Sequence, residues 1–218
     1  MMDDLFVSLR PRTVLADGAA WLPGFALPDA EVLHQAIANV SAAAPFRHFR
    51  TRMGPMSAAM TSCGACGWTA DPAGYRYSRT DPMTDQPWPD MPDALRHLAA
   101  RAAAEAGYEA FDPVSCLINR YAPGAGMGLH QDRDEGYPEA PVVSVSLGVP
   151  ARFSFGGSGR SDPKQIIDLL DGDVVVWGGA SRFAWHGVSP IRETFHPQTG
   201  AMRYNLTFRA INAALFRP

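Results

Sequence analysis

The chain has 218 residues, of which 46% are hydrophobic and 19% are charged, and its formal net charge is −3. These values are typical of an ordinary globular protein with one sizeable domain, and no apolar run is long enough to cross a bilayer. The small negative charge does not indicate nucleic-acid binding, although it leaves room for a local basic patch.

Cysteine, proline and glycine usage narrows the class further. Three cysteines are too few for a disulfide framework, and the acidic N-terminal segment lacks the apolar stretch of a signal peptide. We therefore expect a reducing cytoplasm as the setting. The 19 prolines and 20 glycines indicate many turns and favour a loop-rich β architecture over a helical bundle.

The first predicted helix covers the segment 28–44, which begins with a Pro-Asp start signal and places Val32, Ala36 and Ile37 on one face. The segment of about 45–90 follows, and we expect it to be irregular because it is rich in methionine, glycine, proline and aromatic residues. Its Cys-x-x-Cys pair lacks the further ligands that zinc needs, so small packed residues are the favoured interpretation.

A second helix is predicted over 91–107. Asp93 is the N-cap candidate, Leu95, Leu98 and Ala102 recur at helical spacing, and a glycine ends the segment. Neither helix is long or apolar enough to form a core alone. Both are therefore expected to pack on another layer.

From about residue 111 the sequence changes to short apolar runs separated by turns. An Asp-Gly pair between two of these runs, in LLDGDVVV, predicts a hairpin. Many short strands without alternating helices indicate a mainly β protein, an antiparallel sandwich or jelly roll flanked by two helices. The predicted strands are 114–122, 142–149, 152–157, 165–170, 173–179, 183–188 and 203–210.

The stretch LHQDRDE concentrates a histidine and three acidic residues. On an extended strand His130, Asp132 and Asp134 would share one face, with the two intervening residues on the other. His186, which follows another strand-like run, is the best third ligand for a metal bound by His130 and Asp132. Two histidines and one carboxylate form the facial triad of non-haem Fe(II) oxygenases. A solvated charged loop is the alternative.

A second polar set follows from strand alternation. RYNLTFR carries two arginines, an asparagine and a threonine on one face, and CLINRY adds an asparagine and a tyrosine. Arginine forks suit bidentate recognition of carboxylates, so the set predicts a cage for a dicarboxylate such as 2-oxoglutarate. A strand with its arginines in water is the alternative. The cage residues are Asn119, Tyr121, Arg203, Asn205 and Arg209.

These motifs resemble the AlkB-type Fe(II)/2-oxoglutarate dioxygenases, which repair alkylated nucleobases. CLINRYAPGA, LHQDRDE, PVVSVSLG, GDVVVWGG and RYNLTFR match in order and spacing, and the likeness extends from about residue 20 to about residue 210. The resemblance implies a single domain, 1–218. Its expected parts are a nucleotide-recognition lid at about 45–90 and a double-stranded β-helix (jelly-roll) core at about 111–210.

The resemblance also implies roles for the motif residues. The iron ligands are His130, Asp132 and His186. Arg203 and Tyr121 would hold the distal carboxylate of 2-oxoglutarate. The iron-chelating end of 2-oxoglutarate would lie against Asn119, Asn205 and Arg209.

The activity implied is oxidative demethylation of N-alkylated bases such as 1-methyladenine and 3-methylcytosine. It uses Fe(II), O₂ and 2-oxoglutarate, and it releases formaldehyde, succinate and CO₂. Single-stranded DNA is the expected partner, because extrusion of the base costs least there. The same chemistry on RNA, or a non-catalytic jelly-roll binding protein, is the alternative. We expect a monomer that does not bind membranes.

The substrate side is expected to combine aromatic, acidic and apolar groups. Trp68 and Tyr75 resemble lid aromatics that stack on the base, although core packing would explain them equally well. Asp134 would favour a cationic base. Met60 and Leu117 either line the pocket or belong to the core.

Basic residues near the expected lid offer contacts to phosphate. PFRHFRTR, residues 45–52, contains three arginines, and Arg160 lies in a glycine-rich loop. A solvated basic run is the alternative. The segment RTRMGPMS departs from the family pattern, because it is one residue shorter and lacks an expected tyrosine. Strand contacts are therefore less specified than the chemistry.

Overall fold

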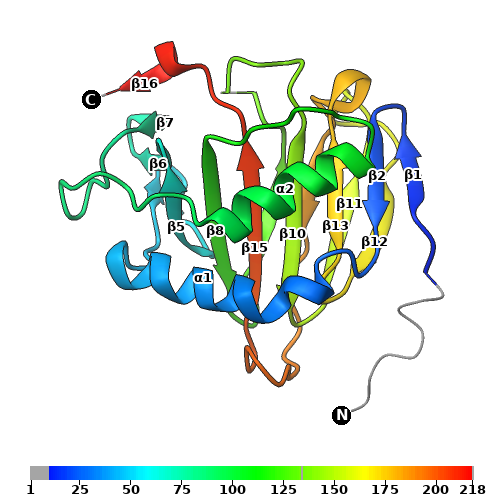
Figure 1. The fold of residues 1–218 in the computed structure, drawn as a ribbon, viewed down its shortest axis with the longest axis horizontal. Coiled ribbons are helices and arrows are strands. Elements are labelled where there is room, and N and C mark those ends of the chain that lie inside the picture. The colour runs from blue at the N-terminus through cyan, green and yellow to red at the C-terminus, as the bar shows by residue number, and fades with distance from the viewer. Residues whose placement is uncertain (1–9, 134, 218) are drawn as a thin grey trace.

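The computed structural model describes residues 10–133 and 135–217 (Figure 1). Its largest element, which we call the major sheet, is antiparallel and has the strand order β1-β2-β13-β10-β15-β8-β5 in the described residues. The strands are β1 Thr13–Ala16, β2 Ala19–Leu22, β13 Val174–Trp177, β10 Val142–Gly148, β15 Arg203–Arg209, β8 Ser115–Tyr121 and β5 Ala59–Gly64.

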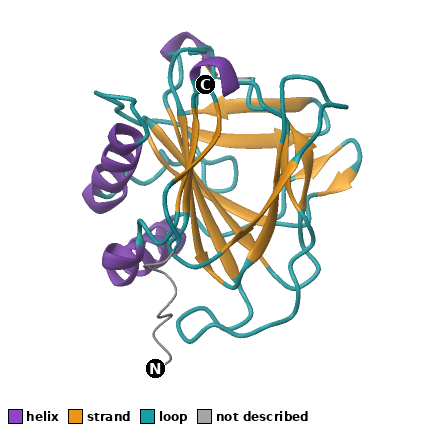
Figure 2. Ribbon diagram, turned by 90° about the vertical axis from the view of Figure 1, so that its right-hand side faces the viewer, coloured by secondary structure: helices purple, strands orange, loops and turns teal. Residues whose placement is uncertain are grey.

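A second antiparallel sheet, the minor sheet, packs against one face of the major sheet (Figure 2). Its order is β12-β11-β14-β9, and the strands are β12 Gln165–Leu169, β11 Ala151–Phe155, β14 His186–Val188 and β9 Met127–His130. Phe153 and Phe155 from this sheet meet Val142, Val175 and Trp177 from the major sheet in a shared apolar cluster. The space between the sheets is therefore largely filled by core side chains.

The helices α1 (Ala30–Ala43) and α2 (Asp93–Glu105) cover the other face of the major sheet (Figures 1 and 2). Both predicted helices are confirmed. The predicted face of α1 is partly wrong, because Val32 is exposed and Leu33 is buried in its place. Asp93 lies in the first turn of α2, while Pro92 is the N-cap residue. No helix in the described chain is long and apolar enough to span a membrane.

The segment 45–90 is not irregular, so that prediction is wrong. It contributes β5 to the edge of the major sheet and forms two small sheets of its own. β6 and β7 pair antiparallel, and β16 joins β7 in parallel near the C-terminus. These strands are β3 Arg50–Thr51, β4 Gly54–Pro55, β6 Gly67–Asp71, β7 Gly74–Ser78 and β16 Phe216–Arg217.

The predicted strands from residue 114 onward are confirmed in type, with β13 and β14 shorter than expected. The predicted Asp-Gly hairpin is wrong, because β12 and β13 belong to different sheets. The Asp171–Gly172 turn is instead a corner at which the chain crosses from the minor to the major sheet. Gly172 has a φ of 76°, and a Cβ there would lie 2.5 Å from Leu27.

Asp173 fixes this corner. Its carboxylate is fully buried and accepts two hydrogen bonds from Arg10, at 2.8 and 3.0 Å. It also accepts from the Trp21 indole at 3.2 Å and from the backbone N–H groups of Gly24 and Leu170 at 2.8 and 3.0 Å. A buried charge with this many donors is stable only while the whole set is present.

We predict that Asp173→Asn lowers the free energy of unfolding by about 3–5 kcal/mol, because Arg10 loses its buried counter-ion. Urea unfolding followed by circular dichroism measures the change. Asp168→Asn is the matched control, since its pair with Arg152 is exposed and should be worth less than about 1 kcal/mol. Equal effects of the two substitutions would contradict this prediction.

Candidate active site

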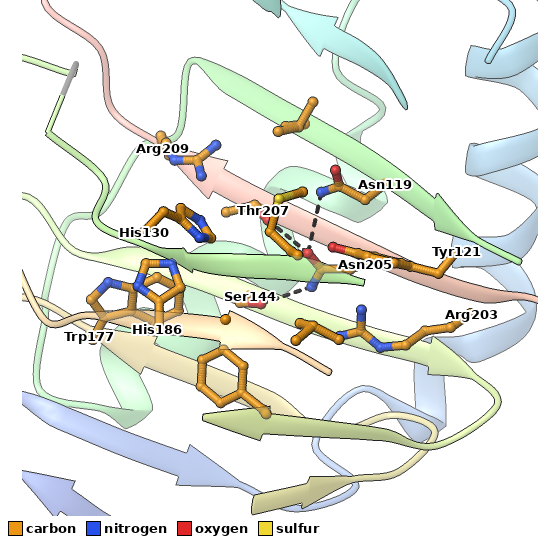
Figure 3. Close-up of a pocket in the computed structure, with 15 residues that line it drawn as sticks. Asn119, Tyr121, His130, Ser144, Trp177, His186, Arg203, Asn205, Thr207 and Arg209 are labelled. Atoms are coloured by element: carbon orange, nitrogen blue, oxygen red, sulfur yellow. Dashed lines mark hydrogen bonds between the residues drawn. The ribbon is translucent and has the colours of Figure 1, made fainter. Parts of the chain in front are cut away.

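A cavity lies between the two sheets and collects the polar set predicted from alternation (Figure 3). Along β15 the residues Arg203, Asn205, Thr207 and Arg209 line it, while Leu206 and Phe208 on the other face belong to the helix-side core. Arg203 and Arg209 are both buried, which excludes the alternative of a strand with its arginines in water. The remaining polar lining comes from Asn119, Tyr121, Ser144, His130 and His186.

The predicted His-Asp-His group is assembled beside this cavity, which is lined by His130 and His186 but not by Asp132. His130 ends β9 and His186 begins β14, and the two residues are Cα partners across the strand pair. Asp132 lies two residues beyond β9. One potential ligand atom of each residue lies within 4.8 Å of those of the other two, which makes this group the candidate metal site among the described residues.

Both histidines are oriented by main-chain oxygens. Nδ1 of His130 lies 2.9 Å from the carbonyl oxygen of Gly128, and Nδ1 of His186 lies 2.9 Å from that of Ala184. Such contacts assign the proton to Nδ1 and leave Nε2 as the acceptor for a metal. Burial, with the nearby His130, lowers the pKa of His186 to about 4, so its imidazole is neutral.

The carboxylate of Asp132 is positioned by an ion pair, not by strand alternation. Because β9 ends at His130, the expected common strand face does not extend to Asp132. Arg209 donates from Nε and Nη2 to Oδ2 of Asp132, at 3.2 and 2.9 Å, and Oδ1 lies 3.9 Å from Nε2 of His130. Burial opposes ionisation of Asp132, but Arg209 and both histidines outweigh it and lower its pKa.

Gln131 also differs from the expected alternation. It lines the cavity beside the metal site instead of facing away, and its side-chain amide donates to the carbonyl oxygens of Ser158 and Phe183. The alternative of a solvated charged loop is excluded for Asp132, which is buried. Asp134 lies outside the described residues.

The far end of the cavity holds a buried guanidinium with unused donors. Arg203 is 1% exposed and donates from Nη2 to Ser146 at 2.9 Å. Nε and Nη1 have no hydrogen-bond partner among the described residues. Tyr121 lies against it, with the guanidinium carbon 5.0 Å from the ring centroid. Burial lowers the pKa of Arg203, so this group needs an anion to offset its desolvation.

An amide and hydroxyl ladder joins the two ends. Asn205 donates to Ser144 at 2.8 Å and to the carbonyl oxygen of Val145 at 3.0 Å. The Thr207 hydroxyl donates to Oδ1 of Asn205 at 3.0 Å, and the side-chain amide of Asn119 donates to the same oxygen at 3.4 Å. Oδ1 of Asn119 is buried and has no partner among the described residues. The cavity thus offers unpaired polar atoms on both Arg203 and Asn119.

A second cavity adjoins the metal site and opens toward the segment 45–90. Four of the predicted substrate residues, Met60, Trp68, Tyr75 and Leu117, line it. Trp68 and Tyr75 stack on each other with ring centroids 5.4 Å apart and planes at 24°. Tyr75 is largely exposed, whereas Met60 and Leu117 are buried. Met60 and Leu117 were expected either to line the pocket or to belong to the core. Both residues do both, because they are buried in an apolar cluster and also line this cavity.

Two of the arginines predicted to contact phosphate lie in different environments. Arg47 is not free for phosphate, because it forms a buried ion pair with Asp81 and packs near Phe49 and Trp88. Arg160 is exposed, and its guanidinium carbon lies 5.0 Å from the Trp185 ring centroid. Arg160 lines neither the cavity between the sheets nor the second cavity beside Trp68 and Tyr75.

Sequence reasoning missed three buried residues beside the metal site. Tyr77 donates to Glu135 at 3.0 Å, and Arg182 donates to the same carboxylate at 3.1 Å. Glu135 belongs to LHQDRDE, but its partners are distant in sequence, so no local pattern indicated them. The three cysteines are buried and free, as expected of small packed residues.

Comparison with known proteins gives the same picture. The family model of the 2OG-Fe(II) oxygenase superfamily matches residues 18–209. The "Alpha-ketoglutarate-dependent dioxygenase AlkB" of Salmonella typhimurium is 54% identical over 210 residues, covering 95% of this chain and 97% of that protein. The protein of the same name from Escherichia coli is 53% identical, again over 95% of this chain and 97% of its own.

More distant relatives extend the likeness to the fold. The solved structure of OsALKBH1 has a TM-score of 0.78 and 28% identity, and the match covers 91% of this chain and 99% of that one. The "DNA N(6)-methyladenine demethylase ALKBH1C" of Arabidopsis thaliana is 32% identical over 165 residues, 64% of this chain and 36% of that protein. The chain therefore belongs to the 2OG-Fe(II) oxygenase superfamily, and within it to the AlkB dioxygenases.

Proposed function

We propose that the protein removes N-alkyl groups from nucleobases such as 1-methyladenine and 3-methylcytosine in DNA by oxidative demethylation, which reverses the damage directly. The observation that carries this proposal is a cavity with the two histidines of the His-Asp-His group at one end. At its other end lies a guanidinium, two of whose nitrogens have no hydrogen-bond partner among the described residues. Its membership of the AlkB dioxygenases supplies the reaction class.

The metal site fits Fe(II). His130, Asp132 and His186 offer two neutral imidazoles and one carboxylate, the donor set that leaves positions open for 2-oxoglutarate and O₂. Bound Fe(II) would supply the oxidising chemistry, in which O₂ and 2-oxoglutarate are consumed, the N-alkyl carbon is oxidised, and succinate, CO₂ and formaldehyde are released. The chain itself holds the ligands, orients the base and limits the access of water.

The other end of the cavity fits a carboxylate. We assign the distal carboxylate of 2-oxoglutarate to Arg203 and Tyr121, because Nε and Nη1 of Arg203 are buried and no described residue pairs with them. Asn119 and Asn205 would lie along the metal-chelating end. Arg209 remains a candidate there, although its guanidinium is already engaged with Asp132.

The substrate base is assigned to the second cavity. Its aromatic side is formed by Trp68 and Tyr75, whose faces suit a flat cationic ring. We assign residues 45–90 as the substrate lid and residues 111–210 as a double-stranded β-helix core within one domain, 1–218. Asp134 and Arg160 remain candidates for contacts with the base and the strand.

Single-stranded DNA is the proposed partner, since a flipped base is released most easily from an unpaired strand. The Arabidopsis relative named a DNA demethylase supports DNA, while RNA presents the same base edges and remains the second candidate. The free cysteines fit a reducing cytoplasm. We propose that the protein acts there as a monomer.

We predict iron- and 2-oxoglutarate-dependent release of formaldehyde from an oligonucleotide that carries 1-methyladenine. His186→Ala removes a metal ligand and should reduce release to background. His97→Ala, on the exposed face of α2, is the matched control and should retain the wild-type rate. The assay compares methylated DNA and RNA strands of one sequence. No release from either strand would overturn the proposed function, and release from RNA alone would make RNA the substrate.

We predict that Arg203→Lys raises the KM for 2-oxoglutarate by about 10- to 100-fold, because a charged hydrogen-bond fork is lost. Steady-state assays with varied 2-oxoglutarate measure this effect. Arg120→Lys is the control, since Arg120 lies on the opposite face of β8 against Phe46. An unchanged KM in Arg203→Lys would show that the distal carboxylate binds elsewhere.

We predict that Tyr75→Ala raises the KM for the methylated strand by about 5- to 100-fold, because stacking of one base on an aromatic ring is worth about 1–3 kcal/mol. The KM for 2-oxoglutarate should stay at the wild-type value. Tyr137→Ala, another exposed tyrosine that lines neither cavity, serves as the control. An equal rise in both KM values for Tyr75→Ala would contradict a specific contact with the base.

A further inference from the structure

A buried polar group surrounds the metal ligand Asp132, and the reaction proposed above gives no role to three of its members, Glu135, Arg182 and Tyr77. It consists of Asp132 and Glu135 from the loop after β9, Arg209 from β15, Arg182 after η3 (Gly179–Ser181) and Tyr77 from β7. Two carboxylates face two guanidinium groups, so the formal charges cancel. The group connects four segments of the chain.

Arg182 holds the loop that carries Asp132 with all three of its donor nitrogens. Nη1 donates to the backbone carbonyl oxygen of Asp132 at 2.7 Å, and Nη2 donates to Oε2 of Glu135 at 3.1 Å. Nε donates to the carbonyl oxygen of Ala140 at 3.0 Å. Because the guanidinium is planar and rigid, these contacts fix the loop more firmly than a lysine could.

Glu135 and Asp132 compete for the same N–H group. Nε of Arg209 donates to Oδ2 of Asp132 at 3.2 Å and lies 3.3 Å from Oε1 of Glu135. The other partners of Glu135 are Arg182 on Oε2 and the Tyr77 hydroxyl on Oε1. If Arg182 were absent, the charge of Glu135 would be balanced only by Arg209.

We propose that Arg182 is a positioning residue for the metal site. It neutralises Glu135 and thereby leaves Arg209 to Asp132, whose Oδ1 is then directed at the metal side. Tyr77 assists by satisfying Oε1 of Glu135, and it connects this arrangement to β7. The inference rests on the proposed metal site and adds a role for the charges behind it.

The test measures Co(II) binding to the purified full chain by titration and by its visible absorption spectrum. Arg182→Gln should weaken Co(II) binding by about 10- to 100-fold and change the spectrum, as expected for a residue that orients a ligand. Adding Glu135→Gln to Arg182→Gln should restore at least half of the loss on a logarithmic scale, because Arg209 no longer faces an unbalanced carboxylate. A purely structural role predicts no such rescue.

The control is Arg47→Gln, which removes another buried arginine of an ion pair, in the segment 45–90. It should destabilise the fold but leave Co(II) affinity unchanged. Wild-type affinity in Arg182→Gln, or a double variant that binds no better than Arg182→Gln, would overturn the inference. Equal Co(II) binding by the wild type and His186→Ala would instead overturn the metal site itself.

If Arg182→Gln does not fold, a milder substitution tests the same inference. Tyr77→Phe removes one donor from Glu135 and should weaken Co(II) binding several-fold. Tyr108→Phe is its matched control, because the Tyr108 hydroxyl donates to Gly18, outside both cavities. Tyr77→Phe with the affinity of Tyr108→Phe would contradict the inference.

Discussion

Two guanidinium groups buried on one face of β15 are the constraint on which the rest of the site depends. A buried arginine is costly unless anions and acceptors offset its desolvation. Arg209 is paired with Asp132 and Glu135, and this pairing brings the loop after β9 to the histidines. Two nitrogens of Arg203 have no partner in the part of the chain that the structure describes, so an anion is needed there. One strand thus specifies both the metal end and the carboxylate end.

The fold keeps this strand in a fixed environment. β10 and β8 flank β15 with continuous registers, so Ser146, Ser144 and Asn119 stand beside its polar residues. The minor sheet closes the cavity and supplies both histidines through β9 and β14. α1 and α2 cover the outer, apolar face. The hydrogen bonds of Asp173 stabilise the corner between the two sheets. Because the site lies between these sheets, its geometry depends on that corner.

Alternation and spacing were sufficient for much of this picture. Alternation along 203–209 identified the polar face, since this strand is paired on both sides in an unbroken register. Alternation gave the wrong basis for Asp132, because β9 ends at His130 and the side chain of Asp132 is positioned by its ion pair with Arg209. β5 was missed because its partner β8 is distant in sequence. The local pairs β3–β4 and β6–β7 were missed because the glycine- and proline-rich composition of 45–90 indicated loops. The Asp-Gly pair marks a corner between sheets. Arg182 and Tyr77 were missed because both are far in sequence from Glu135, their common hydrogen-bond partner.

The most direct test of the account is a crystal structure of the protein grown without O₂ in the presence of Mn(II) and 2-oxoglutarate. We predict one metal ion contacted by His130, Asp132 and His186, with the distal carboxylate of 2-oxoglutarate hydrogen-bonded to Arg203. The ion pair between Arg209 and Asp132 should persist. A metal ion bound by other residues, or 2-oxoglutarate that makes no contact with Arg203, would contradict the account.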